Sequence, residues 1–184
     1  MSDPRVWGVT LAERARAFPC DALDFEHDEA FYRGVDVAAP PPLVYRWLCQ
    51  LRVAPYSYDL LDNFGRPSPA RLIPGLERLE IGQRMMTIFR LAEFEYGETM
   101  TIGLASRLGE AVMGGFAGSY RVEPTNGRAR LTAKILVRYP RGAYGKLLRR
   151  VMPHADLFMF KEQLRRLKRY AERDAALPQH REVE

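Results

Sequence analysis

The segment 112–139 carries the pattern that most restricts how this chain can fold. Thr125, Asn126 and Gly127 form a hairpin signal, because Asn and Gly readily adopt the positive φ angles of a tight turn. After this turn, apolar residues occupy every second position: Ala129, Leu131, Ala133, Ile135, Val137 and Tyr139. Before the turn, the residues that share one strand face are Val112, Phe116, Tyr120 and Val122. The pattern predicts an antiparallel hairpin with one buried face.

Three further segments have the pattern of β-strands. In 31–37, Phe31, Val35 and Val37 lie at period two. Residues 85–94 are apolar on both faces in places, which is typical of a strand that is covered on both sides. Residues 98–104 alternate cleanly between apolar and polar or small side chains. Together with the hairpin, these segments predict a largely antiparallel sheet.

Helical periodicity occurs on either side of the later strands. Pro40, Pro41 and Pro42 have φ angles suited to a first helical turn, and apolar residues then recur at helical spacing over 43–51. After Pro140 the helical period returns. Pro153 is expected to split this region into a short helix at 142–151 and a long one at 154–174, because proline lacks an N–H and clashes with the preceding turn. The long helix carries one apolar stripe: Leu157, Phe160, Leu164, Leu167 and Ala171.

This order of elements predicts an α+β fold in which a curved antiparallel sheet wraps around a long C-terminal helix. Residues 1–30 are expected to form an N-terminal arm, 31–174 the domain and 175–184 a flexible tail. Where a curved sheet leaves the helix, a gap lined by apolar side chains can hold a ligand. The residues predicted to line it are Tyr58, Ile88, Arg90, Met100, Ile102, Phe116, Tyr120 and Phe158. The alternative is a core that these side chains fill completely.

Composition and motifs exclude several classes of protein. With 184 residues the chain is long enough to fold without a metal or disulfide, and two cysteines exclude a disulfide scaffold. The three histidines are far apart in sequence, so a zinc site is not expected, and no glycine-rich phosphate motif occurs. No apolar run has the length of about 18 residues that a membrane span needs. We therefore expect a cytoplasmic protein without metal or cofactor.

The sequence from Arg33 to Gly82 resembles a known superfamily. Its most specific pieces are VDVAAPPPLVYRWLCQLRVAPYSYDLLDN and the later LERLEIGQRM. These resemble the START-like or SRPBCC superfamily, whose helix-grip fold occurs in polyketide cyclases and dehydrases, lipid-transfer domains and plant pollen allergens. The resemblance covers about residues 31–173. It implies a deep hydrophobic cavity between the sheet and the C-terminal helix, closed by the loop after the short helices. Because members of this superfamily differ in activity, it implies an apolar ligand without fixing a reaction.

Three titratable residues are candidates for acid–base chemistry. A carboxylate such as Asp59, next to the phenol of Tyr58, could act as a general base if burial raised its pKa. His154 could transfer a proton near neutral pH. These residues would serve a cyclase or dehydratase. Each also has a structural interpretation: Tyr58 could pack on a helix, and His154 could cap the helix or be exposed. Asp59 could cap a turn or pair with Arg52 or Arg66. Arg90 could meet a ligand anion or point outward.

The C-terminal helical region is strongly basic. Residues 141–173 hold ten Lys and Arg residues against three acidic ones. A basic helical face can contact an anionic membrane, and this is a further hypothesis, in which the protein acts through its surface. Specific binding to nucleic acid is not expected, because no recognised motif accompanies the charge. The protein is expected to be a monomer or a homodimer.

Overall fold

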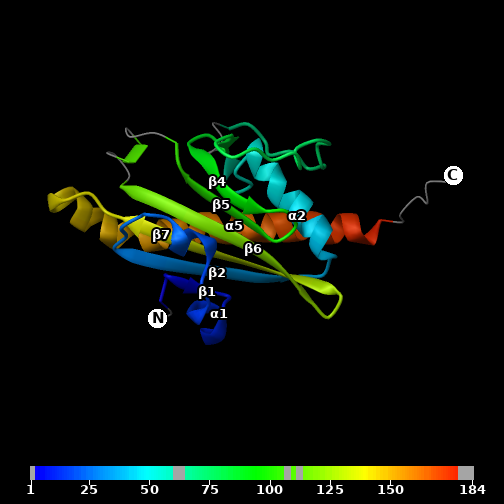
Figure 1. Ribbon diagram of the computed structural model, residues 1–184, viewed down its shortest axis with the longest axis horizontal. Coiled ribbons are helices and arrows are strands. Elements are labelled where there is room, and N and C mark those ends of the chain that lie inside the picture. Colours follow the sequence, from blue (N-terminus) through cyan, green and yellow to red (C-terminus); the bar gives the residue numbers. More distant parts are fainter. Residues whose placement is uncertain (1–2, 60–64, 106–108, 111–113, 178–184) are drawn as a thin grey trace.

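The computed structural model describes residues 3–59, 65–105, 109–110 and 114–177 and contains one seven-stranded sheet in the order β1-β2-β7-β6-β5-β4-β3 (Figure 1). The strands are β1 (Val6–Trp7), β2 (Glu29–Val37), β3 (Arg84–Met85), β4 (Phe89–Glu95), β5 (Thr99–Leu104), β6 (Gly115–Thr125) and β7 (Arg128–Arg138). All neighbouring strands are antiparallel except β1, which runs parallel to β2.

The predicted hairpin is present as β6 and β7, which pair along their full length from Gly115 opposite Arg138 to Thr125 opposite Arg128. Asn126 and Gly127 form the turn with φ angles of 48° and 74°. Positive φ at both central positions is the geometry of a type I′ turn, which matches the twist of the strands that it joins. The local sequence therefore sets both the turn and the register of the two central strands.

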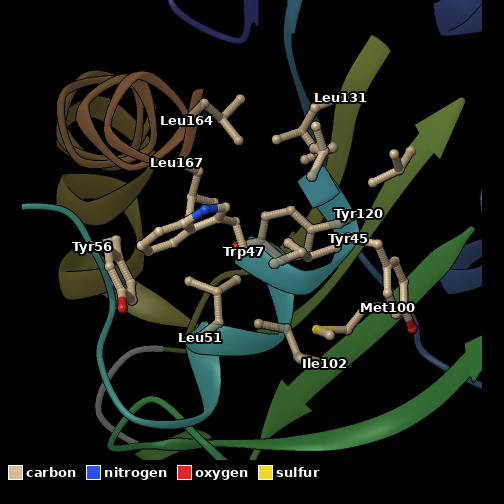
Figure 2. Packing of buried hydrophobic residues seen from close by; sticks show 14 of the residues in the cluster. Tyr45, Trp47, Leu51, Tyr56, Met100, Ile102, Tyr120, Leu131, Leu164 and Leu167 are labelled. Carbon is tan, nitrogen blue, oxygen red and sulfur yellow. The ribbon is translucent and has the colours of Figure 1, made fainter. Parts of the chain in front are cut away.

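Two helices cover one face of the sheet. The shorter helix, α2 (Pro41–Cys49), begins at the three prolines and continues into the 3₁₀ turn η2 (Gln50–Arg52), and the long helix α5 (Gly142–Ala176) follows β7. Figure 2 shows Leu164 and Leu167 of α5 directed toward Trp47 of α2, with Ile102 and Tyr120 of the sheet on the other side. This arrangement is the predicted α+β helix-grip fold, with the core between the sheet and α5.

Residues 11–25 pack on the opposite face of the sheet, whereas Trp7 of β1 packs against the main core. They include α1 (Leu11–Ala15), which Thr10 and Glu13 begin with a reciprocal capping box, and the 3₁₀ turn η1 (Pro19–Ala22). The buried side chains of Phe18 and Cys20 contact a small second apolar cluster on β6 and β7. The segment expected to form an arm is thus in contact with the sheet through much of its length.

The predicted break at Pro153 is wrong. The chain forms one helix of 35 residues, with Pro153 buried inside it. A proline in a helix interior costs about 3 kcal/mol, because one hydrogen bond is lost and the ring crowds the preceding turn. Here Leu148 and Met152 before the proline and Phe160 after it all pack against the same core. This shared burial holds both halves of the helix in line.

The segment 85–94, predicted as one strand, forms a hairpin of the short strands β3 and β4. Met86 lies between them with a φ of 49°, and its backbone N–H donates to the carbonyl of Leu51. The residues of this turn, Met86–Thr87–Ile88, include none of the Gly, Asn or Pro that usually mark a turn, so the sequence pattern concealed it. A non-glycine residue at positive φ is strained, and such residues often occur at functional sites.

The remaining sequence predictions concern the ends of elements. The long helix was predicted to end near residue 174 and ends at Ala176. Of the expected flexible tail, residues 178–184 lie outside the described part of the chain, as does Val112 of the predicted hairpin. Among the residues that the structure describes, no helix combines the length and apolar character needed to cross a membrane.

Candidate functional site: a pocket between the sheet and α5

A pocket of about 420 Å³ lies between the sheet and α5, and we call it the sheet–helix pocket. The sheet side contributes mainly apolar residues: Met86, Ile88, Phe89, Ile102, Leu104, Phe116, Tyr120 and Val137. The helix contributes Met152, Ala155, Asp156, Met159, Phe160 and Gln163. The turn between β3 and β4 forms one wall, and Pro55 and Ser57 of the segment after α2 contribute a second. Its polar side chains are few, as in pockets that bind small apolar molecules.

One polar group in the lining is a hydrogen-bonded pair. The hydroxyl of Tyr120 donates to Oε1 of Gln163 at 2.7 Å, and Nε2 of Gln163 donates to the carbonyl of Pro55 at 2.6 Å. Both side chains are buried. Burial raises the pKa of Tyr120, so its hydroxyl stays protonated and remains a donor. The pair connects β6, α5 and the segment after α2, and its main hydrogen-bonding groups are satisfied within the protein.

The second polar group is a buried ion pair. Nε and Nη2 of Arg33 both donate to Oδ2 of Asp156, at 3.1 Å and 2.5 Å. The Arg33 side chain is 0% exposed and that of Asp156 is 8% exposed. Nη1 of Arg33 donates to the carbonyls of Arg5 and Tyr32. The guanidinium is therefore held from several sides, and Asp156 alone of the pair lines the pocket.

The ion pair is perturbed by its burial. Loss of solvent raises the pKa of Asp156 to about 6, although the charge and hydrogen bonds of Arg33 act in the opposite direction. The same burial lowers the pKa of Arg33. Asp156 is thus mostly ionised at neutral pH and gains a proton under mildly acidic conditions. A carboxylate with a perturbed pKa in a pocket marks a candidate functional site.

Four residues that the sequence predicted for the lining do line the pocket: Ile88, Ile102, Phe116 and Tyr120. Ile102 and Tyr120 project from neighbouring strands toward the helices (Figure 2). Met100 is fully buried in the core and is not part of the lining. Strand alternation placed these residues on the covered face, but it does not show where along that face the gap opens.

The other predicted residues lie outside the lining. Phe158 is 53% exposed, and its ring stacks on that of Tyr58 with centroids 4.1 Å apart. Arg90 is exposed and donates to the carbonyl of Gly82. His154 is exposed on α5. Asp59 accepts hydrogen bonds from Ser68 at 2.5 Å and from Arg166 at 2.9 Å.

The surroundings of Asp59 do not favour a general base. Partial burial acts to raise the pKa of Asp59, but the hydrogen bonds from Ser68 and Arg166 outweigh it and hold the pKa below its usual value. The carboxylate is therefore a weak base near neutral pH. An ion pair of Asp59 with an arginine was the structural alternative from the sequence, but the observed partner is Arg166 of α5 and not Arg52 or Arg66.

Sequence reasoning missed the polar residues of the pocket. Arg33 lies on the same face as Phe31, Val35 and Val37, so the alternation of that strand already placed it among buried residues. A charged residue in such a position requires a partner, because an unpaired buried charge is very unfavourable. That partner, Asp156, lies 123 positions away in the sequence, and no local pattern identifies it. Among the described residues, no group of three or more His, Cys, Asp or Glu side chains could hold a metal ion.

No family model and no curated protein matches this sequence. Among solved structures, a hypothetical protein from Helicobacter pylori has a TM-score of 0.52 at 16% identity, over 85% of this chain and 96% of that one. The di-domain ARO/CYC StfQ from the steffimycin biosynthetic pathway has a TM-score of 0.46 at 16% identity, over 80% of this chain. This chain spans 52% of the length of StfQ.

The Aha1 dimer from Colwellia psychrerythraea has a TM-score of 0.49 at 14% identity, over 79% of this chain and 97% of that one. Identities this low say nothing about ligand or reaction. The likeness to the Helicobacter pylori protein concerns the fold, which is also evident from the strand order and from the long helix across the sheet. The predicted α+β helix-grip fold is therefore confirmed.

Proposed function

We propose that this protein binds a small apolar or amphipathic molecule in the sheet–helix pocket. The observation that carries the proposal is the pocket itself, whose volume of about 420 Å³ lies in the range of known ligand sites, about 300–1,000 Å³. Its walls are mainly Ile, Leu, Met and Phe side chains. A lipid or a polyketide-like compound has the matching character. Removal of its apolar surface from water would supply most of the binding free energy.

Binding of Nile red, a neutral dye that fluoresces in apolar surroundings, tests this proposal. Met159 projects from α5 into the lining, so Met159→Trp is expected to fill part of the pocket and to weaken binding of the dye about tenfold or more. Leu11→Trp is the matched control, because Leu11 is 81% exposed on α1 and lies outside the pocket. Equal binding by both variants would place the dye elsewhere and contradict the proposal. Native mass spectrometry of the purified protein would identify a ligand that copurifies.

Acid–base catalysis on such a ligand was the second hypothesis from the sequence. Tyr58, Asp59 and His154 all lie outside the pocket lining, and Asp59 is held in an ion pair. A general base must lie within hydrogen-bonding distance of the proton that it removes. The geometry therefore favours binding over catalysis by these three residues.

Contact with an anionic membrane is a second proposed property, carried by the first half of α5. Leu147, Val151 and Phe158 are 58%, 51% and 53% exposed and recur at helical spacing. Residues 141–155 contain no acidic side chain, and Lys146 and Arg150 form no ion pair with the described residues. An exposed apolar stripe with flanking cations is typical of helices that lie in a membrane interface. Figure 1 shows these first turns of α5 extending beyond the sheet.

Vesicle sedimentation tests the membrane contact. The protein is expected to bind vesicles of phosphatidylcholine and phosphatidylglycerol more strongly than vesicles of phosphatidylcholine alone, and the difference should fall with added salt. Leu147→Glu should weaken binding, whereas Leu11→Glu on the other side of the molecule should not. Arg150→Glu should weaken it more than Arg169→Glu, which makes the same charge change near the far end of the helix. Vesicle binding that depends on neither lipid charge nor salt concentration would contradict this proposal.

A further inference from the structure

One carboxylate oxygen in the sheet–helix pocket has no hydrogen-bond donor in the part of the chain that the structure describes. Both hydrogen bonds from Arg33 go to Oδ2 of Asp156, and Oδ1 accepts none from the described residues. The side chain lines the pocket and is only 8% exposed, so a ligand in the pocket is well placed to donate to Oδ1. The other buried polar pair, Tyr120 and Gln163, is already satisfied within the protein. Oδ1 of Asp156 is therefore the strongest acceptor that the lining offers to a ligand.

We propose that the pocket selects an amphipathic molecule whose polar end is a neutral hydroxyl group, an alcohol or a phenol, that donates a hydrogen bond to Oδ1 of Asp156. This inference rests on the proposed ligand binding and adds the chemical class of the ligand. The apolar body of the ligand lies against side chains such as Ile102, Phe116 and Met159.

The charge of the ion pair explains why the polar end is neutral. Arg33 is fully buried and already balances Asp156, so the pair adds no net charge to the pocket. A carboxylate ligand would place a second negative charge beside Asp156, and an ammonium group would leave an unbalanced positive charge. Both carry a desolvation cost that a hydroxyl group avoids. An ether of the same length avoids that cost too, but it has no proton to donate and leaves Oδ1 unsatisfied.

A series of competitors with one chain length tests the inference. Decan-1-ol, 1-methoxydecane and decanoic acid compete with Nile red for the wild-type protein at pH 8, where Asp156 is ionised. Because a hydrogen bond to a charged acceptor is stronger than one between neutral groups, the alcohol is expected to bind at least about tenfold more tightly than the ether and the acid. Equal binding of all three would overturn the inference and leave the pocket as a general apolar site. Failure of every compound to displace the dye would overturn it together with the proposed function.

Two double variants assign the preference to Asp156. Arg33→Met with Asp156→Leu removes the pair from the pocket without leaving either charge alone, and the preference for the alcohol should disappear. Arg166→Met with Asp59→Leu is the matched control, because it removes an Arg–Asp ion pair of α5 that lies outside the lining. The control should keep the preference. A preference that survives in the first double variant would overturn the role of Asp156.

A single variant covers the case in which the double variant does not fold. Asp156→Asn keeps the shape of the side chain but has a neutral oxygen, which accepts a weaker hydrogen bond. The ratio of the affinities for alcohol and ether should then fall severalfold. An unchanged ratio would overturn the inference.

Discussion

Replacing Arg33 with methionine is expected to destabilise the protein more than replacing both Arg33 and Asp156 with apolar residues. The single change leaves a carboxylate that is 8% exposed without its cation. Removal of one member of a buried pair typically costs about 3–5 kcal/mol, whereas replacement of both members by apolar residues is often neutral or stabilising. The expected order of stability therefore places Arg33→Met below the double variant Arg33→Met with Asp156→Leu.

Urea unfolding measures this difference. With a slope of about 2 kcal/mol per molar urea, a loss of about 3 kcal/mol lowers the midpoint of Arg33→Met by about 1.5 M. The double variant is expected to unfold near the wild-type midpoint. Asp156→Leu leaves the buried Arg33 without its anion and should also cost about 3 kcal/mol, so the coupling free energy from the full cycle should be about 6 kcal/mol in magnitude.

The ion pair of Arg166 and Asp59 serves as the control. Its side chains are 18% and 24% exposed, so water screens the pair and either single change should cost less than about 1 kcal/mol. If the double variant of Arg33 and Asp156 loses as much stability as Arg33→Met alone, the loss does not come from an unpaired carboxylate. That result would refute the reasoning from burial.

Three further changes have defined outcomes. The raised pKa of Asp156 means that the folded protein binds this proton more tightly than the unfolded chain, so between pH 7 and pH 4 the wild type should gain up to about 3 kcal/mol of stability over Asp156→Asn. Urea unfolding of both proteins at several pH values measures this gain. If their free energies of unfolding changed with pH in the same way, the result would contradict the prediction. Gly145→Ala should lower the melting temperature by several degrees, because its Cβ would lie 1.6 Å from the carbonyl oxygen of Pro140, although alanine normally favours a helix. An unchanged melting temperature would mean that this contact relaxes. Tyr56→Phe should be neutral or stabilising by up to about 1 kcal/mol in urea, because the buried hydroxyl has no partner among the described residues, and a clear loss would reveal one.

Local patterns predicted the elements of this fold well. Alternation identified β6, β7 and the face of the sheet that α2 and α5 cover, because the side chains of a strand point alternately to its two faces. The same logic failed at Met86, where contacts with the rest of the protein stabilise a turn within an apolar stretch. Reasoning from the local effect of proline failed at Pro153, because packing of both helix halves on one core outweighs the lost hydrogen bond and the steric clash of the ring.

The site was less accessible to sequence reasoning than the fold. Candidate residues chosen for their chemistry, such as Asp59 and His154, lie outside the pocket, whereas residues chosen for their place in a strand pattern, such as Ile102 and Phe116, line it. Asp156 was visible in the sequence only as one acidic residue in a basic helix. Its position in the pocket follows from how α5 crosses the sheet.

The sequence by itself determined β2, β5, β6 and β7, the hairpin turn, the amphipathic helices and which face of each is buried, because these depend on residues close together in the chain. It also placed Arg33 on a buried face. Only the tertiary structure decided that Asp156 meets Arg33, that Oδ1 receives no hydrogen bond from the described residues and that a pocket opens beside it. Periodicity specifies the direction of a side chain from its own element, but the distance between two elements depends on the packing of the whole core.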